Sequence, residues 1–236
     1  MLTLNRNDVH VWNVSLEVDS TDIAHLAKIL SPDEQARVNR FHFEKDRTQF
    51  IISRGILRVL IGRYLGENPS HIQFAYNTFG KPLLMCSVDS DSLMFNVSHA
   101  GGKALYAFSK KQPLGIDLER IRLNIAFESI AKRFFSPVEI TMFSSLQEPC
   151  KREAFFSWWT RKEAFIKAKG VGFSLGVDQF DVTLRPGEPA RLIHTRYDER
   201  DVRHWSLHDI DAGSGFKAAL AVRSTQPRIS HYNWCP

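Results

Sequence analysis

Residues 159–167 read WTRKEAFIK and lie inside a helical pattern that we expect over residues 152–169, with Gly170 as its stop. Glu163 and Lys167 are four residues apart, so on a helix they lie on one face. Taken alone, such a pair is a routine stabiliser of a helix surface, worth roughly 0.2–0.5 kcal/mol.

The neighbours of this pair favour a functional role. Aromatic residues crowd the same helix: Phe155, Phe156, Trp158, Trp159 and Phe165. Four cations lie there as well: Arg161, Lys162, Lys167 and Lys169. So many aromatic residues are unusual on an exposed helix, and charges among them need partners because burying an unpaired charge is costly. An anion near the end of the helix would relieve this positive charge.

Residues 115–119 read GIDLE and continue a predicted strand over residues 114–118. Asp117 and Glu119 are two residues apart, so on a strand their side chains point to the same side. Alternating carboxylates also occur on solvated strand faces, and the short motif alone does not exclude that. With Glu163, however, they supply three carboxylates for one Mg²⁺, which prefers oxygen ligands.

Two shorter motifs are candidates for phosphate contacts. Ser98 and His99 end a predicted strand and precede two glycines, a loop that can present N–H groups and an imidazole to a phosphate. As neighbours on a strand they point to opposite faces, which argues against a Ser-His nucleophile pair. Residues 79–82 (FGKP) read first as a β-turn, and the functional alternative places Lys81 against a nucleotide phosphate.

The remaining pattern predicts a mixed α/β (or α+β) chain with two similar halves. Serine, proline and glutamate form a capping box at residues 31–34, and the pattern recurs at residues 136–139. Helix is expected after the first box as far as Leu65, in one or two pieces. Strands are expected at residues 10–18, 72–76, 93–97, 104–108, 180–184, 205–207 and 216–222. The polar residues 110–113 mark a boundary, giving halves 1–112 and 113–236.

Composition excludes several classes of protein. The 236 residues are 43% hydrophobic and 24% charged, so a globular core is expected. No apolar run approaches the ~18 residues of a membrane span, and the first twelve residues lack a signal pattern, so we expect a cytoplasmic protein. Cys86, Cys150 and Cys235 are far apart, which argues against a zinc site or a disulfide framework.

The net charge of +5 favours an anionic partner such as a nucleotide-like cofactor, a nucleic acid or an acidic protein, without choosing among them. Six basic residues are spread along the first helical region: Arg37, Arg40, Lys45, Arg47, Arg54 and Arg58. A solvated helix face is the usual meaning of such a pattern, although some of these side chains are within reach of an anionic ligand.

Taken together, these motifs resemble the Sfp-type 4'-phosphopantetheinyl transferases. The chain has both of the family's signatures, at residues 115–119 and 159–167. Further matches follow in the same order as in that family: residues 80–82 (GKP), 96–99 (NVSH), 131–136 (AKRFFS) and 169–175 (KGVGFSL). The resemblance implies a pseudo-dimer of two α/β halves with the active site in the cleft between them.

The resemblance also implies an activity, which is transfer of the phosphopantetheine arm of coenzyme A to a serine hydroxyl of an acyl or peptidyl carrier protein. Adenosine 3',5'-bisphosphate is the other product. Asp117, Glu119 and Glu163 are then the Mg²⁺ ligands, and Lys167 contacts the pyrophosphate. Ser98, His99 and Arg37 contact phosphates, with Arg37 at the 3'-phosphate. Gly80, Lys81 and Pro82 lie beside the adenine. Either Glu163 or a water on the metal is the base.

One departure and two alternatives accompany this interpretation. Many family members have a basic residue where this chain has Glu34, which shifts the expected 3'-phosphate contact to Arg37, Lys45 or His99; capping of the helix explains the glutamate.

The resemblance implies an acidic carrier protein as partner, no nucleic acid, no membrane and a monomer. The alternatives are a Mg²⁺-dependent nuclease or phosphohydrolase, and a non-catalytic anion-binding module.

Overall fold

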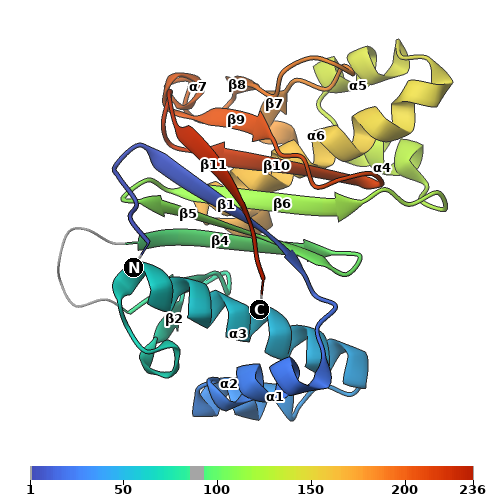
Figure 1. The fold of residues 1–236 in the computed structure, drawn as a ribbon. Coiled ribbons are helices and arrows are strands. Elements are labelled where there is room, and N and C mark those ends of the chain that lie inside the picture. Colours follow the sequence, from blue (N-terminus) through green and yellow to red (C-terminus); the bar gives the residue numbers. More distant parts are fainter. Residues whose placement is uncertain (1, 86–92, 236) are drawn as a thin grey trace.

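The computed structural model describes residues 2–85 and 93–235, and these build four layers. Two β-sheets pack face to face, and a long helix covers the outer face of each (Figure 1). The first sheet has the strand order β11-β1-β5-β4 and the second has the order β6-β10-β9. The mixed α/β class expected from the sequence is therefore confirmed.

The first sheet is built mainly from the N-terminal half. Strand β1 (Asp8–Ser15) pairs antiparallel with β5 (Lys103–Lys110), which pairs antiparallel with β4 (Leu93–Ala100). Gly101 and Gly102, both with positive φ, turn β4 into β5 as the sequence predicted. The last strand, β11 (Arg228–Asn233), pairs parallel with β1. The C-terminal segment thus returns to the first sheet, and the division of the chain at residue 112 stays a prediction.

Helix α3 (Glu44–Leu65) covers the outer face of the first sheet. Helices α1 (Ser20–Lys28) and α2 (Pro32–Val38) pack against α3 and lie below it in the view of Figure 1. The predicted capping box precedes α2, with Glu34 Oε2 accepting the Ser31 N–H at 3.0 Å. Gly66 ends α3 in the left-handed conformation. A 3-10 turn, η1 (Pro69–His71), leads to a small hairpin of β2 (Phe74–Tyr76) and β3 (Pro82–Leu84).

The second half repeats this plan. Strand β6 (Leu114–Arg120) pairs antiparallel with β10 (Phe216–Val222), which pairs with β9 (Ser206–Asp209). Helix α5 (Pro137–Ser144) follows the second capping box, and α6 (Glu148–Lys169) ends at Gly170. The smaller elements are α4 (Phe127–Phe134), η2 (Gly172–Leu175), η3 (Val177–Gln179), β7 (Phe180–Val182), β8 (Leu192–Thr195) and α7 (Asp201–His204). Helix α6 begins one turn earlier than the sequence predicted.

Alternation along the strands explains the layers. On β6, Leu114, Ile116 and Leu118 face the first sheet and join the apolar cluster between the two sheets. The intervening residues of β6, including Asp117, therefore face α6. The aromatic residues of α6 pack into a separate core in the second half, and α3 packs on the first sheet in a third.

The buried polar residues correct one interpretation of the sequence. Arg54 and Arg58 do not lie on a solvated helix face, because only 9% and 1% of them is exposed. Arg58 Nε donates to Glu34 Oε2 at 2.6 Å, and Glu34 is itself 1% exposed. The second half has the matching arrangement, with Lys162 Nζ 2.9 Å from Glu139 Oε1. In each half, the glutamate of a capping box is paired with a cation from the long helix.

Two further sequence expectations concern cysteines and membranes. Cys150 and Cys235 are free thiols, and Cys86 lies outside the described residues. None of the helices in residues 2–85 and 93–235 is both long enough and apolar enough to cross a membrane.

Candidate active site

The predicted site lies where the edge strands of the two sheets meet. These strands, β4 and β6, are joined through side chains of β4. Asn96 Oδ1 accepts the Ile116 N–H at 2.8 Å, and Ser98 Oγ accepts the Leu118 N–H at 3.2 Å. The two β4 side chains thereby satisfy backbone donors of β6 that would otherwise be unpaired. Asn96 belongs to the motif at residues 96–99 (NVSH). Its role here depends on a long-range pairing of strands that the sequence alone does not reveal.

Gly115 brings β6 into contact with α6. A Cβ atom at this position would lie 2.2 Å from the carbonyl oxygen of Ala164 and 2.4 Å from the backbone nitrogen of Ala168. Only a residue without a side chain permits this approach. Asp117, two residues further along the strand, is thereby held against the last turns of α6, beside Lys167.

Asp117, Lys167 and Ser98 form one hydrogen-bonded group. Lys167 Nζ lies 2.6 Å from Asp117 Oδ1 and 3.1 Å from Ser98 Oγ. The Ser98 hydroxyl donates to Asp117 Oδ1 at 3.0 Å, so with its two accepted bonds it is saturated. Asp117 Oδ2 is buried and has no hydrogen-bond partner among the described residues. A buried carboxylate oxygen in this condition favours a bound cation.

The three predicted carboxylates influence one another. Burial raises the pKa of Glu163 to about 7, and the charges of Asp117 and Glu119 add to this effect while Lys167 opposes it. Burial also raises the pKa of Glu119, with the charge of Asp117 as the next cause. Carboxylates that resist ionisation beside one another are stabilised in the ionised form by a cation.

The chemistry of Asp117, Glu119 and Glu163 fits a divalent cation. One oxygen of Asp117 has no partner among the described residues, and the three carboxylates repel one another when ionised. In the orientations that residues 2–85 and 93–235 adopt, no three Asp, Glu, His or Cys side chains converge as a finished metal site. At Asp117 Oδ1 the positive charge comes from the Lys167 ammonium. The assignment of Asp117, Glu119 and Glu163 as metal ligands therefore stays a prediction.

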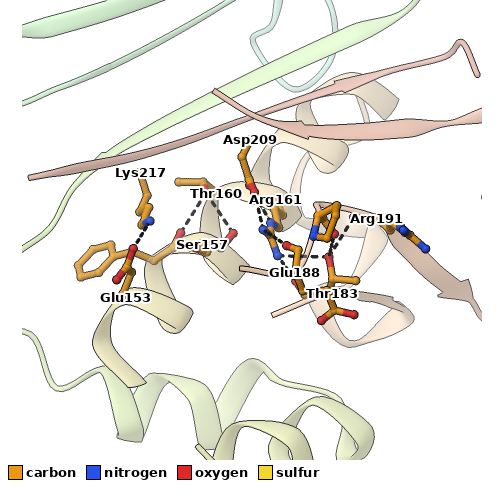
Figure 2. Close-up of polar contacts among 11 residues, drawn as sticks. Glu153, Ser157, Thr160, Arg161, Thr183, Glu188, Arg191, Asp209 and Lys217 are labelled. Atoms are coloured by element: carbon orange, nitrogen blue, oxygen red, sulfur yellow. Dashed lines mark hydrogen bonds and ion pairs between the residues drawn. The ribbon is translucent and has the colours of Figure 1, made fainter. Parts of the chain in front are cut away.

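Other polar contacts fix the rotation of α6. Arg161 donates to both carboxylate oxygens of Asp209, at 2.9 and 2.6 Å, and to the carbonyl oxygens of Thr183 and Glu188 (Figure 2). Arg161 is two residues from Glu163, roughly 200° around the helix. Arg161 therefore holds the far side of α6 to β9 and to the loop after β7, so that Glu163 and Lys167 face β6.

The cations of α6 correct the expectation that an anion must relieve them. Arg161 pairs with Asp209, Lys162 with Glu139, Lys167 with Asp117 and Lys169 with Asp201. Lys162 is 1% exposed and also bonds to the carbonyl oxygens of Val177 and Phe180, so it is unavailable to a phosphate. Lys167, by contrast, lines an open cavity.

Two adjoining cavities bring the other predicted site residues together. One, of about 220 Å³, is lined by Arg37, Pro82, Asn96, Ser98 and His99, among others. The other, of about 320 Å³, is lined by Gly80, Lys81, Pro82, Asn96, Glu163 and Lys167, among others. Because both include Pro82 and Asn96, the two cavities adjoin, and together we call them the groove; residues of both halves line the second cavity. Ser98 is buried and His99 exposed, so they face opposite ways as predicted.

Lys81 donates hydrogen bonds to backbone carbonyl groups of the second half. Its Nζ donates to the carbonyl oxygen of Lys167 at 2.6 Å and to that of Leu114 at 3.2 Å. Burial and, to a lesser extent, the nearby charge of Lys167 together lower the pKa of Lys81 to about 8. The side chain thus ties the β2–β3 hairpin to the second half, while its stem lines the groove. A contact between Lys81 and a phosphate stays a prediction.

Comparison with known proteins identifies the family. Residues 13–111 match a family model described as 4'-phosphopantetheinyl transferase, N-terminal, and residues 113–221 match the 4'-phosphopantetheinyl transferase superfamily. Over 98% of this chain and 95% of the relative, it is 39% identical to the 4'-phosphopantetheinyl transferase HetI of Nostoc sp. (strain PCC 7120). The chain belongs to the 4'-phosphopantetheinyl transferase superfamily. The two consecutive matches agree with two halves, as the resemblance predicted.

Other relatives of this phosphopantetheinyl transferase are more distant. It is 35% identical to the 4'-phosphopantetheinyl transferase Sfp of Bacillus subtilis (strain 168), over 66% of each chain. It is 28% identical to the human L-aminoadipate-semialdehyde dehydrogenase-phosphopantetheinyl transferase, over 82% of this chain and 67% of the relative. The enzyme moves the 4'-phosphopantetheine group of coenzyme A to a carrier protein, and the nuclease or phosphohydrolase alternative finds no support.

Proposed function

We propose that the transfer takes place in the groove between the halves, with Asp117, Glu119, Glu163 and Lys167 at the reacting phosphates. The carrier serine oxygen attacks the phosphorus that bears the pantetheine, and the bond from that phosphorus to the bridging oxygen breaks. Adenosine 3',5'-bisphosphate leaves. The observation that carries this proposal is the group around Asp117, in which a buried carboxylate oxygen without a partner lies beside a lysine that borders the groove.

In this proposal Asp117, Glu119 and Glu163 hold Mg²⁺. When bound, this ion supplies positive charge to the pyrophosphate oxygens and lowers the cost of the charge that develops on the leaving bisphosphate. Glu119 and Glu163 are the two carboxyls whose ionised form is disfavoured without a cation. In this proposal Glu119 and Glu163 are therefore fully ionised only when the ion is bound.

Lys167 binds the pyrophosphate through its ammonium group. It already lies at the boundary between Asp117 and the groove, and its side chain is 29% exposed. A cation in this place attracts the phosphate oxygens most strongly when they carry the charge of the breaking bond. Ser98 and Asp117 orient the Lys167 ammonium group by hydrogen bonding. His99 and Arg37, in the adjoining cavity, contact the 3'-phosphate of coenzyme A.

Glu163 receives the proton of the carrier serine. It borders the same cavity as Lys167, which the carrier serine must enter in this proposal. Phosphoryl transfer passes through a loose transition state, so only partial removal of the proton is needed and the positioning of the serine contributes most of the rate.

We further propose an acidic carrier protein as partner and a monomeric, cytoplasmic enzyme. The net charge of +5 supports docking of an acidic surface by charge complementarity. The two halves supply both walls of the groove within one chain, so a second copy is not required to complete it.

The test is release of adenosine 3',5'-bisphosphate, followed by chromatography, from coenzyme A and Mg²⁺ with and without an apo acyl carrier protein. We expect release only with the carrier, ending at one equivalent per carrier. Release without a carrier would mean that water is the acceptor and would contradict the proposal. The same assay with a metal chelator tests the Mg²⁺ assignment separately. Release that continues after chelation would contradict the Mg²⁺ assignment and leave the transfer itself standing.

A further inference from the structure

The tip of the β2–β3 hairpin, residues 77–81, is a turn held together by its own hydrogen bonds. Asn77 Oδ1 accepts the N–H groups of Phe79 at 3.0 Å and of Lys81 at 2.9 Å. The Asn77 carbonyl oxygen accepts the Gly80 N–H at 2.9 Å, and Gly80 has a φ of 78°. An asparagine that bonds its own turn in this way fixes the local backbone. The side chains that leave the tip therefore start from a defined position.

The tip docks on the residues that end α6, the helix that supplies two of the proposed site residues. Asn77 Nδ2 donates to the carbonyl oxygen of Gly170 at 2.9 Å. The Phe79 ring packs on Gly172, where an added Cβ atom would lie 3.0 Å from a ring carbon. A polar and an apolar contact thus join the hairpin of the first half to the end of α6 in the second half.

Lys81 adds a third contact, which reaches both α6 and β6. Its Nζ donates to the carbonyl oxygen of Lys167 at 2.6 Å and to that of Leu114 at 3.2 Å. The Lys167 carbonyl lies in the last turn of α6, where carbonyl groups lack partners within the helix and a cation is favourable. Leu114 begins β6 directly before Gly115, where the strand contacts the helix. Lys81 therefore clamps α6 to β6 beside their backbone contact.

This clamp fixes Lys167 at its backbone, while other residues fix its ammonium group. The Lys167 carbonyl accepts from Lys81, and Lys167 Nζ lies 2.6 Å from Asp117 Oδ1 and 3.1 Å from Ser98 Oγ. An ammonium that stabilises developing charge must be placed accurately, because a displacement of about 1 Å can lower a rate about a hundredfold. A residue that holds the backbone of Lys167 can therefore control the rate without touching coenzyme A.

Lys103 provides a matched contrast, because it also joins the two halves through a lysine and a backbone carbonyl. Lys103 Nζ, from β5, donates to the carbonyl oxygen of Ala212 at 2.7 Å. It lines a cavity of about 680 Å³, which is a different cavity from the one that Glu163 and Lys167 line. Loss of Lys103 thus removes a similar bond between the halves at a place away from the groove.

We propose that Lys81 is a positioning residue for the transfer: it holds the last turn of α6 so that Lys167 reaches the pyrophosphate. Its own ammonium group stays on the two backbone carbonyls when coenzyme A binds. This inference rests on the proposed function, in which Lys167 acts at the reacting phosphates. Lys81 then affects the rate through Lys167, and the affinity for coenzyme A depends on it little.

The test is Lys81→Met, which removes the ammonium group and keeps an apolar stem in the groove wall. We expect kcat with an apo acyl carrier protein to fall about ten- to a hundredfold and the KM for coenzyme A to change little, because Lys167 acts most strongly on the charge of the breaking bond. Lys81→Arg, which keeps N–H donors there, should recover part of kcat. A raised KM with normal kcat would show direct contact with coenzyme A and overturn the proposal, as would no change in either.

Two measurements on Lys81→Met do not depend on activity. In hydrogen–deuterium exchange followed by mass spectrometry, peptides that cover the end of α6 should exchange faster than in the wild type, because the last turn loses its clamp. Calorimetry with coenzyme A, without metal or carrier, should give nearly the wild-type affinity. Unchanged exchange, or a loss of affinity of about tenfold or more, would overturn the proposal.

Two variants control for general effects of mutation. Lys103→Met should leave kcat, KM and the exchange of α6 unchanged, and a loss of kcat equal to that of Lys81→Met would overturn the proposal. Asn77→Ala removes the amide that binds Gly170 without changing any charge, so we expect it to lower kcat in the same direction as Lys81→Met.

Lys167→Met separates this inference from the proposed function. If Lys167→Met transfers at the wild-type rate, the proposed role of Lys167 fails and this inference fails with it. If Lys167→Met is impaired while Lys81→Met keeps the wild-type kcat, the inference on Lys81 alone fails.

Discussion

Gly115 and Ala164 lie so close together that a single added carbon would collide: the Cβ of any other residue at 115 would stand 2.2 Å from the Ala164 carbonyl oxygen. This contact joins β6 to α6 at the point where one supplies Asp117 and the other supplies Glu163 and Lys167. The side chains that we propose for the reaction are therefore positioned by a close approach of two backbones at Gly115, a residue without a side chain.

Gly115→Ala tests this approach directly. Because the neighbouring atoms are backbone, the strand must move away from the helix, and we expect a loss of stability of about 1–3 kcal/mol or more. Transfer activity should fall even under conditions in which the variant is fully folded, since Asp117 moves away from Lys167. Urea unfolding and steady-state kinetics on the same samples measure both. Gly187→Ala is the control, because it has open space and only a positive φ of 77°, costing roughly 1 kcal/mol.

Glu163→Gln should abolish transfer while the fold survives. The change removes a charge with little change of volume, so we expect a loss in kcat/KM of at least about a hundredfold. Stability without metal should not decrease, because the variant removes a carboxylate whose ionised form is disfavoured at this position. Glu153→Gln, on the same helix but paired with Lys217 at the surface, should keep full activity. A folded Glu163→Gln enzyme with normal activity would remove Glu163 from the site.

Glu34→Lys, which introduces the type of residue common in the family, should destabilise this protein. Glu34 is the partner of buried Arg58 and lies near Arg54, so the change places three cations together. Breaking a buried pair costs about 3–5 kcal/mol. Asp33→Lys, at the exposed neighbouring position, should cost under about 1 kcal/mol. Circular dichroism during urea unfolding distinguishes the two, and a stable Glu34→Lys protein would contradict the pairing.

His10 should make stability depend on pH. Burial lowers its pKa, and the Trp12 indole and the Tyr64 hydroxyl form a chain that ends at His10 Nδ1, 2.8 Å away. The unfolded chain, whose histidine has a pKa near 6.5, therefore binds a proton more readily than the folded protein. Stability is present above that pH and is lost as the pH falls through it. In unfolding measurements from pH 7.5 to 5, His10→Gln should flatten the curve; parallel curves would contradict this.

Local signals in the sequence predicted the elements that carry the site. Ser31 and Ser136 begin helices because each capping box acts within four residues, and Gly66 and Gly170 end α3 and α6 for the same reason. The alternation on β6 correctly placed Asp117 on the opposite face from Leu118. These features need no distant partner.

Features that depend on distant partners were missed or misread. The cations of α6, Lys162 among them, were expected to need an anion, but Lys162 is paired with Glu139 from another helix. Arg54 and Arg58 resemble a solvated face because their shared partner, Glu34, lies in a different helix, α2, which precedes α3. The pairing of β11 with β1 joins the two ends of the chain, and no short-range pattern encodes it.

We propose that this chain transfers phosphopantetheine to a carrier serine with Asp117 as a ligand of the metal. The most direct measurement is the intact mass of an apo carrier protein after incubation with coenzyme A, Mg²⁺ and either the wild-type enzyme or Asp117→Asn. We expect a gain of one phosphopantetheine group with the wild-type enzyme, no gain when EDTA is present, and no gain with the variant. A gain that persists in EDTA or with folded Asp117→Asn would contradict it.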